Sequence, residues 1–158
     1  MLFSAIRSFA PGMLLLAGCL LALLPGIAAA GHRNPPPAEC PQPRFTGKAP
    51  AALYARVNPL EANRDNRKAG EKLYHKISNP SCAACHGKQG EGNGPLAEQF
   101  DPRPRNFACA ETVGGIPDGQ LHWIIENGSP GTAMPSFGYL TDEEIWQLVL
   151  YLRQLTDH

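Results

Sequence analysis

The sequence predicts an all-α fold, a small domain of about four helices preceded by an extended proline-rich arm. Three observations support this prediction: helical periodicity in residues 141 to 156, helical periodicity in residues 63 to 77, and no convincing period-two alternation of the kind that strands show. The first pattern is the stronger one, because Thr141-x-x-Glu144 has the form of a capping box. The apolar stripe that follows it comprises Ile145, Leu148, Val149, Leu152 and Leu155. We therefore expect helices and essentially no sheet.

The remaining predicted helices are weaker. The apolar side of the helix over residues 63 to 77 is formed by Gly70, Leu73, Tyr74 and Ile77, and Asn79-Pro80 ends it. We expect a short helix over residues 95 to 100, after a glycine-rich loop. Residues 118 to 127 form another, and Gly128 is its expected terminator.

Residues 31 to 61 form the expected arm. Their prolines, at positions 35 to 37, 41, 43, 50 and 59, interrupt every periodic run. We expect an extended segment with one helical turn at residues 50 to 56, lying over the domain formed by residues 62 to 158. A linker to a membrane anchor is the alternative role of this arm.

The first 30 residues have the pattern of a secretory signal peptide. One charge, Arg7, precedes an apolar stretch from Met13 to Leu24, and the small residues 28 to 30 follow. The apolar stretch contains 12 residues, which is short for a membrane-spanning helix. We expect cleavage after Ala30 and a periplasmic protein. An uncleaved anchor and a lipoprotein processed at Cys19 are the alternatives.

The run Cys82-Ala83-Ala84-Cys85-His86 indicates covalent attachment of a c-type haem. Cysteines three apart lie on one helical turn, so both sulfurs can reach one edge of a porphyrin. A histidine that follows directly can ligate the iron through a neutral ring nitrogen. A thioredoxin-like dithiol would need a βαβ pattern, which is lacking here. A zinc site would need two further ligands, for which Cys40 and Cys109 stand as isolated candidates.

Met134 is the candidate for the second iron ligand. Cleavage of the signal removes Met1 and Met13, so Met134 is the remaining methionine of the mature chain. It lies in an irregular loop over residues 127 to 137, before Pro135, which restricts its backbone. A core-filling methionine is the structural alternative. His122 is the serious rival as a ligand.

Taken together, these motifs resemble a class I cytochrome c over residues 62 to 156. The matching segments, in the family's order, are Cys82-Ala83-Ala84-Cys85-His86-Gly87, Gly90-Glu91-Gly92-Asn93-Gly94-Pro95 and Met134-Pro135-Ser136-Phe137. The resemblance implies a small all-α cytochrome c fold around one haem c, low-spin His86/Met134 ligation and one-electron transfer. It also implies that the Pro95 carbonyl accepts the other N–H of His86.

The resemblance extends to one helix pair, in which Gly70 and Tyr74 on one helix would cross Leu148 and Tyr151 on the other. In the family, glycine at such a crossing permits close approach of the helices. Ordinary core packing is compatible with the same pattern.

Cys40 and Cys109 are left as an even pair once the signal is cleaved and the haem uses Cys82 and Cys85. In an oxidising compartment we expect a disulfide between them, pinning the arm to the domain. Two independent thiols are the alternative.

Charge suggests redox proteins as partners. Residues 44 to 88 carry nine Lys/Arg against three Asp/Glu, whereas residues 89 to 158 carry three against ten. This asymmetry could steer a redox partner, although solvated helix faces that merely differ explain it equally well. No basic stripe with interleaved aromatics suggests nucleic acid. Arg103, Arg105 and Trp123 are candidates to pair with haem propionates, with surface or core packing as the alternative.

Three functions are compatible with these observations. The first is a periplasmic electron carrier rather than an enzyme, exchanging electrons with a dehydrogenase or quinol-oxidising complex and a terminal oxidase or reductase. The second is a haem subunit docked to a larger oxidoreductase. The third is a gas-binding or catalytic haem protein with a labile sixth ligand. Because two strong ligands leave no open iron position, we expect no small-molecule substrate.

Overall fold

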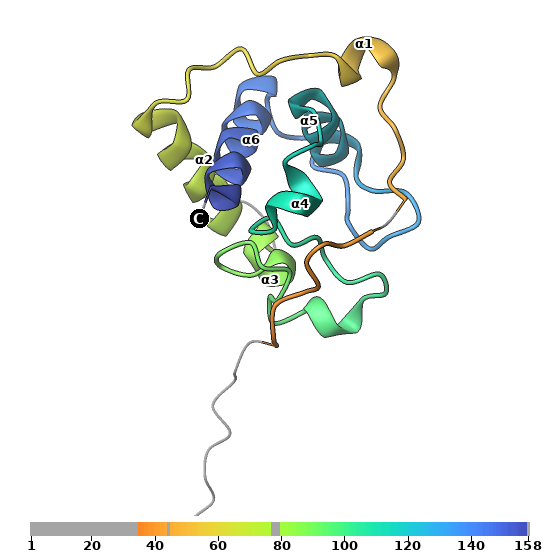
Figure 1. The fold of residues 1–158 in the computed structure, drawn as a ribbon. Helices are drawn as coiled ribbons and strands as arrows, with labels where there is room; N and C mark the ends of the chain where they lie inside the picture. Colours follow the sequence, from red (N-terminus) through yellow and green to blue (C-terminus); the bar gives the residue numbers. More distant parts are fainter. Residues whose placement is uncertain (1–34, 44, 77–79, 158) are drawn as a thin grey trace, which may run out of the picture. The chain divides into compact units, whose positions relative to one another are not determined.

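A computed structural model describes residues 35–43, 45–76 and 80–157 (Figure 1). The helices of these ranges are α1 (Ala51–Tyr54), α2 (Arg64–Lys76), α3 (Cys82–His86), the 3-10 turn η1 (Ala97–Gln99), α4 (Ala110–Val113), α5 (Asp118–Asn127) and α6 (Asp142–Thr156). No strand occurs among the described residues, so the all-α prediction is confirmed. The predicted signal peptide and its cleavage site lie outside these ranges. None of the helices described is both long enough and apolar enough to span a membrane.

Helices α2 and α6 form the predicted crossing pair. A Cβ atom added to Gly70 would lie 2.0 Å from the carbonyl oxygen of Gln147. The two helix backbones are therefore too close at this point for any residue other than glycine at position 70. Tyr74 of α2 and Tyr151 of α6 meet edge to face, with ring centroids 5.2 Å apart. In Figure 1 the two helices lie side by side on the left of the domain.

Helix α6 supplies half of the residues of the hydrophobic core. It begins at the capping box, in which the Thr141 side chain accepts from the Glu144 backbone N–H and the Glu144 side chain accepts from the Thr141 backbone N–H. The buried residues of α6 are Ile145, Trp146, Leu148, Val149, Leu150, Tyr151, Leu152 and Leu155. They pack with α5, which has the predicted bounds and ends before Gly128, where φ is +79°.

Two short elements differ from the predictions. The helix expected over residues 95 to 100 is reduced to η1, because Phe100 already has an extended backbone. Helix α4, directly after Cys109, was not predicted, since four residues are too few to produce a helical period.

The described part of the arm, residues 35–43 and 45–61, contacts the domain at several points. Ala38 N–H donates to the Glu91 carbonyl at 2.8 Å, and Ala49 N–H donates to Oε1 of Gln120 at 2.8 Å. The expected turn at residues 50 to 56 is present as α1. In Figure 1 the arm runs upward past α4 towards α1.

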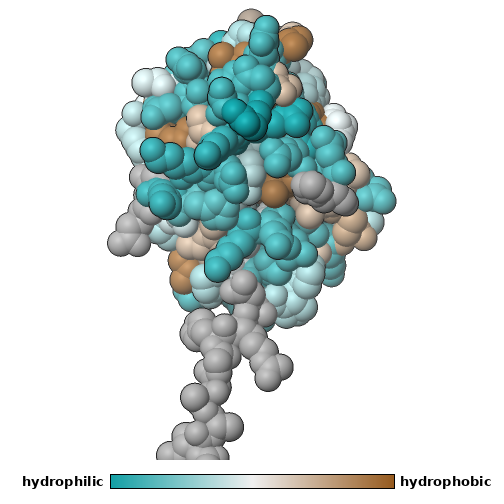
Figure 2. Space-filling model, turned by 90° about the vertical axis from the view of Figure 1, so that its left-hand side faces the viewer, coloured by the Kyte–Doolittle hydropathy of each residue, from teal (hydrophilic) through white to brown (hydrophobic). Residues whose placement is uncertain are grey.

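The face that carries α2 is mainly hydrophilic, as Figure 2 shows from the side on which α2 lies in Figure 1. The α2 side chains of Lys68, Glu71 and Lys72 are exposed, whereas Gly70 and Tyr74 are buried against α6. Helix α2 is therefore amphipathic, with a charged outer side.

Candidate functional site

The predicted haem ligands and attachment residues line one cavity. Its volume is about 760 Å³, and Cys82, Cys85, His86 and Met134 all contribute to its wall. Much of the rest of the wall is apolar and comes from α5, the loop after it and α6, including Leu121, Ile125, Phe137 and Leu152. The fold thus brings together residues that are 48 positions apart in the sequence, His86 and Met134.

Helix α3 presents the C-x-x-C-H residues. It ends after His86 because Gly87 adopts φ +83°, and Gly92 N–H then donates to the His86 carbonyl at 2.8 Å. The loop that follows packs directly on α3: a Cβ atom at Gly94 would lie 2.3 Å from the Ala84 carbonyl oxygen. The glycine-rich loop of the motif therefore covers the helix that carries both cysteines.

The His86 imidazole is buried and held on two sides. Its Nδ1 lies 2.9 Å from the carbonyl oxygen of Arg105, and its ring stacks on Phe107 with centroids 4.5 Å apart. Since a carbonyl only accepts, Nδ1 carries the proton and Nε2 keeps the lone pair that a metal requires.

The acceptor of this hydrogen bond differs from the expected one. We expected the Pro95 carbonyl, but the chain brings Arg105 to the ring, and Pro95 is exposed. A backbone hydrogen bond from Phe107 N–H to the Gly90 carbonyl at 2.6 Å, together with the hydrogen bonds of the arm to Asn106, holds the segment 105–107 against the histidine.

The two cysteines of α3 are thiols in this structure, whereas Cys40 and Cys109 are bonded to each other with an S–S distance of 2.00 Å. Burial raises the pKa of Cys82 to about 11 and also raises the pKa of Cys85, so both are protonated at neutral pH. Neither sulfur is engaged in the disulfide, so both can form a thioether bond.

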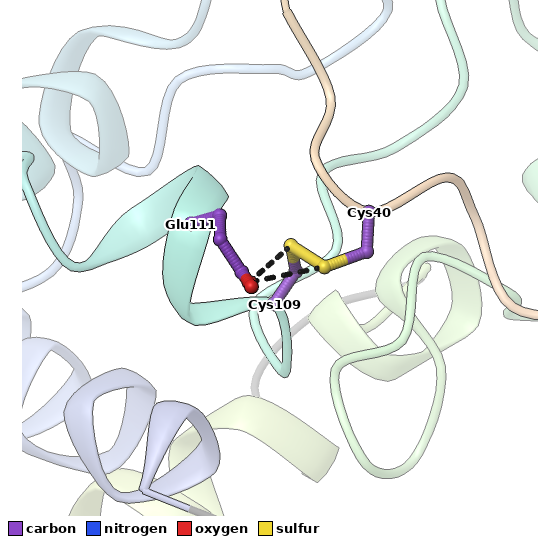
Figure 3. A group of neighbouring side chains, drawn as sticks. All are labelled: Cys40, Cys109 and Glu111. Atoms are coloured by element: carbon purple, nitrogen blue, oxygen red, sulfur yellow. Dashed lines mark hydrogen bonds between the residues drawn. A yellow bond between two sulfur atoms is a disulfide. The ribbon is translucent and has the colours of Figure 1, made fainter.

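Cys40 and Cys109 do not complete a zinc site. Their sulfurs are joined in the disulfide, and Oε2 of Glu111 lies 3.3 Å from Cys40 Sγ and 3.5 Å from Cys109 Sγ (Figure 3). Disulfide sulfurs are poor metal ligands because they carry no thiolate charge. This carboxylate contact therefore does not indicate a metal centre.

Met134 lies half-buried on the loop between α5 and α6. Ser129 N–H donates to the Met134 carbonyl at 3.2 Å, and Met134 N–H donates to Oγ1 of Thr132 at 3.2 Å, so the loop is tied back on itself. Its rival His122 is buried elsewhere: it packs on Trp146 with centroids 4.3 Å apart, and its Nε2 lies 2.9 Å from Oδ1 of Asp142. His122 does not line the cavity.

The three propionate candidates are placed differently from one another. Arg105 lines the cavity, and its Nη2 donates to Oγ1 of Thr46 at 2.8 Å. Arg103 donates from Nη2 to the Pro36 carbonyl at 3.0 Å, and neither Arg103 nor Trp123 lines the cavity.

Two residues at the site were missed from the sequence, Phe107 and Tyr74. The Tyr74 hydroxyl donates to the Gly87 carbonyl at 2.8 Å, next to His86. Burial raises the Tyr74 pKa, so this hydroxyl stays protonated and keeps donating. Neither residue carries a motif, and helical periodicity identifies Tyr74 only as a core residue.

These residues fit a haem on the evidence of this structure. Two cysteines outside the disulfide, a histidine whose Nδ1 faces a carbonyl and a thioether line a single cavity with a mainly apolar wall. No other cluster in the described part of the chain offers this donor set.

Comparisons with known proteins agree with this fit. A family model for cytochrome c matches residues 67–156. Among solved structures, a chain of the Kuenenia stuttgartiensis reducing HAO-like protein complex is similar, with 33% identity and a TM-score of 0.54; the match covers 61% of this chain and 46% of that one. No curated protein matches significantly. The chain belongs to the cytochrome c family, whose members carry covalently bound haem c and transfer electrons.

Proposed function

We propose that this protein is a periplasmic one-electron carrier with a single low-spin haem c. In this proposal Cys82 and Cys85 attach the haem, and His86 and Met134 ligate its iron. The observation that carries the proposal is the shared cavity: four donor residues from α3 and the loop after α5 line one mainly apolar wall.

The chain's residues suit electron transfer better than substrate chemistry. A bound haem would supply an iron that gains and loses one electron. The apolar wall limits water around it, and the Arg105 carbonyl holds His86 in one tautomer. Two protein ligands would leave no iron position for a substrate, so electrons would pass through the haem edge. A thioether ligand favours the ferrous state and so gives a more positive potential than a second histidine.

Export is part of the proposal. The pattern of residues 1 to 30 supports a cleaved signal with a site after Ala30, and the disulfide of Cys40 with Cys109 suits an oxidising compartment. Processing as a lipoprotein at Cys19 predicts a different mature mass. Mass spectrometry of the mature protein distinguishes the two.

Visible spectra of the purified holoprotein and of Met134→Ala test the ligand assignment. We expect the ferric wild type to show the thioether-to-iron charge-transfer band near the red end of the spectrum and the variant to lose it. His122→Phe is the matched control, because it removes the rival ligand, and it should keep the band. A band that survives in Met134→Ala would refute the assignment. Rapid carbon monoxide binding to the reduced wild type would instead indicate a labile sixth ligand.

A second candidate function is a haem subunit of a larger oxidoreductase. The likeness to a chain of the reducing HAO-like complex favours it, since that protein is part of a complex. Isolation of the native protein under mild conditions tests it. Stable co-purification with a catalytic subunit would support the docked subunit, and a monomeric protein would support the free carrier.

A further inference from the structure

The arm makes hydrogen bonds to four consecutive residues of the segment that supports His86. The Pro36 carbonyl accepts from Arg103, Gln42 Nε2 donates to the Pro104 carbonyl at 3.2 Å, and Thr46 accepts from Arg105. Asn106 is bound twice: its Nδ2 donates to the Ala38 carbonyl at 3.0 Å, and its backbone N–H donates to Gln42 Oε1 at 2.7 Å. The arm therefore contacts every residue of the segment 103–106.

Gln42 occupies the centre of this contact and is itself held in place. Its backbone N–H donates to Oγ1 of Thr112 at 2.9 Å, and it lies two residues beyond Cys40, which is bonded to Cys109. The orientation of its amide follows from its partners. The Pro104 carbonyl can only accept and the Asn106 N–H can only donate, so Nε2 must face Pro104 and Oε1 must face Asn106.

The two hydrogen bonds that matter share one peptide unit. Asn106 N–H, which donates to Gln42 Oε1 at 2.7 Å, belongs to the same amide as the Arg105 carbonyl, which lies 2.9 Å from His86 Nδ1. Hydrogen bonds in such a chain polarise one another: an acceptor at the N–H makes the carbonyl oxygen of that amide more negative.

We propose that Gln42 is a positioning residue that orients and polarises the Arg105–Asn106 amide and thereby sets the reduction potential of the site. The inference rests on the proposed function, since it requires His86 to ligate iron. A more polarised carbonyl draws the Nδ1 proton more strongly and makes the imidazole a better electron donor. A better donor stabilises the ferric state, so Gln42 lowers the potential.

This mechanism predicts opposite effects from two substitutions at one position. Gln42→Leu keeps the side-chain size but removes the acceptor, so the midpoint potential should rise. Gln42→Glu gives up the hydrogen bond from Nε2 to the Pro104 carbonyl but places a carboxylate oxygen, a stronger acceptor, at Asn106 N–H, so the potential should fall. A role confined to packing would not produce shifts of opposite sign.

Two control variants separate this effect from others. Asn58→Ala removes two side-chain hydrogen bonds of the arm, to the Trp146 carbonyl and from the Leu60 N–H, but is remote from His86. It should leave the potential unchanged and so controls for a loosened arm. Pro43→Glu places the same added charge on the exposed neighbour of Gln42 and controls for the electrostatic effect of a carboxylate.

The experiment is a potentiometric titration of the mature holoproteins, with proton exchange at His86 Nδ1 followed by NMR of the reduced state. We expect the midpoint potential to be lowest in Gln42→Glu, intermediate in wild type and highest in Gln42→Leu. The His86 Nδ1 proton should exchange roughly tenfold faster in Gln42→Leu than in wild type. A midpoint potential of Gln42→Leu equal to that of wild type would overturn the inference. So would a midpoint potential of Gln42→Glu that is no lower than that of Pro43→Glu. If Gln42→Leu does not fold, the comparison of Gln42→Glu with Pro43→Glu decides alone.

Failure of this inference is distinguishable from failure of the proposed function. A wild type without the low-spin spectrum of histidine and methionine ligation would refute the ligand assignment. A wild type with that spectrum, whose potential does not respond to Gln42, would refute the tuning role only.

Discussion

Gly70→Ala tests the closest contact in the fold, the crossing of α2 and α6. The added Cβ would lie 2.0 Å from the Gln147 carbonyl oxygen and 3.0 Å from Cβ of Tyr151. Because contacts under 3.0 Å essentially never occur, the backbones must separate by about 1 Å at this point. The clashing atom, the Gln147 carbonyl oxygen, belongs to the backbone, so no change of side-chain rotamer can relieve the contact.

The magnitude follows from two opposing terms. Alanine stabilises a helix interior by about 1 kcal/mol relative to glycine, whereas overpacking costs about 1–3 kcal/mol, with the upper end expected against a rigid backbone; the net loss is about 2 kcal/mol. Separation of the helices would also pull on the Tyr74 hydroxyl, which holds the Gly87 carbonyl beside His86. We therefore expect a perturbed haem spectrum along with the loss of stability.

Urea unfolding of the holoprotein, followed by far-UV circular dichroism, measures the effect. Gly115→Ala is the control, because nothing lies within 4 Å of its added Cβ, and we expect a change of at most about 0.5 kcal/mol. If Gly70→Ala is as stable as Gly115→Ala, the steric account of the crossing is wrong.

Three further predictions concern the capping box, a buried histidine and the disulfide. Thr141→Ala should lose about 1 kcal/mol in urea unfolding and Thr141→Ser much less, because only the hydroxyl caps α6; equal losses would contradict this. Burial lowers the pKa of His122 in the folded protein below the value of about 6.5 that histidine has in an unfolded chain, so the unfolded chain binds more protons at acidic pH. The free energy of unfolding should therefore fall from pH 7.5 to pH 5, and fall further in wild type than in His122→Phe. Parallel pH profiles of the two proteins would count against that reasoning. The Cys40→Ser/Cys109→Ser double variant should lose about 4 kcal/mol in the loop-entropy model, and alkylation of two thiols in the unreduced wild type would show that the bond is absent.

The elements predicted correctly are those whose signal is contained in a short stretch of chain. Helix α6 begins at its capping box because Thr141 and Glu144 bond each other's backbones within one turn. Helix α5 ends at Gly128 because glycine adopts the positive φ that the turn needs. Gly70 was placed at the α2–α6 crossing through the family resemblance, and the structure confirms the contact.

The hydrogen bond of His86 shows where such reasoning fails. The family pattern suggested Pro95, nine residues away, whereas the structure brings in Arg105, 19 residues away. Which carbonyl reaches Nδ1 depends on the path of the loop between them, and that path is set by the Phe107–Gly90 hydrogen bond and by the arm. Loops of this kind have no period from which their path could be predicted.

By itself the sequence determined the helical class of the fold and predicted the chemistry of the site. The two cysteines and the histidine of the C-x-x-C-H run lie within five consecutive residues, so their relative positions follow from a short stretch of helix, and apolar periodicity determines which helix faces are buried. Only the tertiary structure decided which groups surround that histidine: the Arg105 carbonyl, the Phe107 ring and, through a shared amide, Gln42 of the arm. These contacts join residues that are far apart in the sequence, and packing of the whole domain, not any local preference, brings them together.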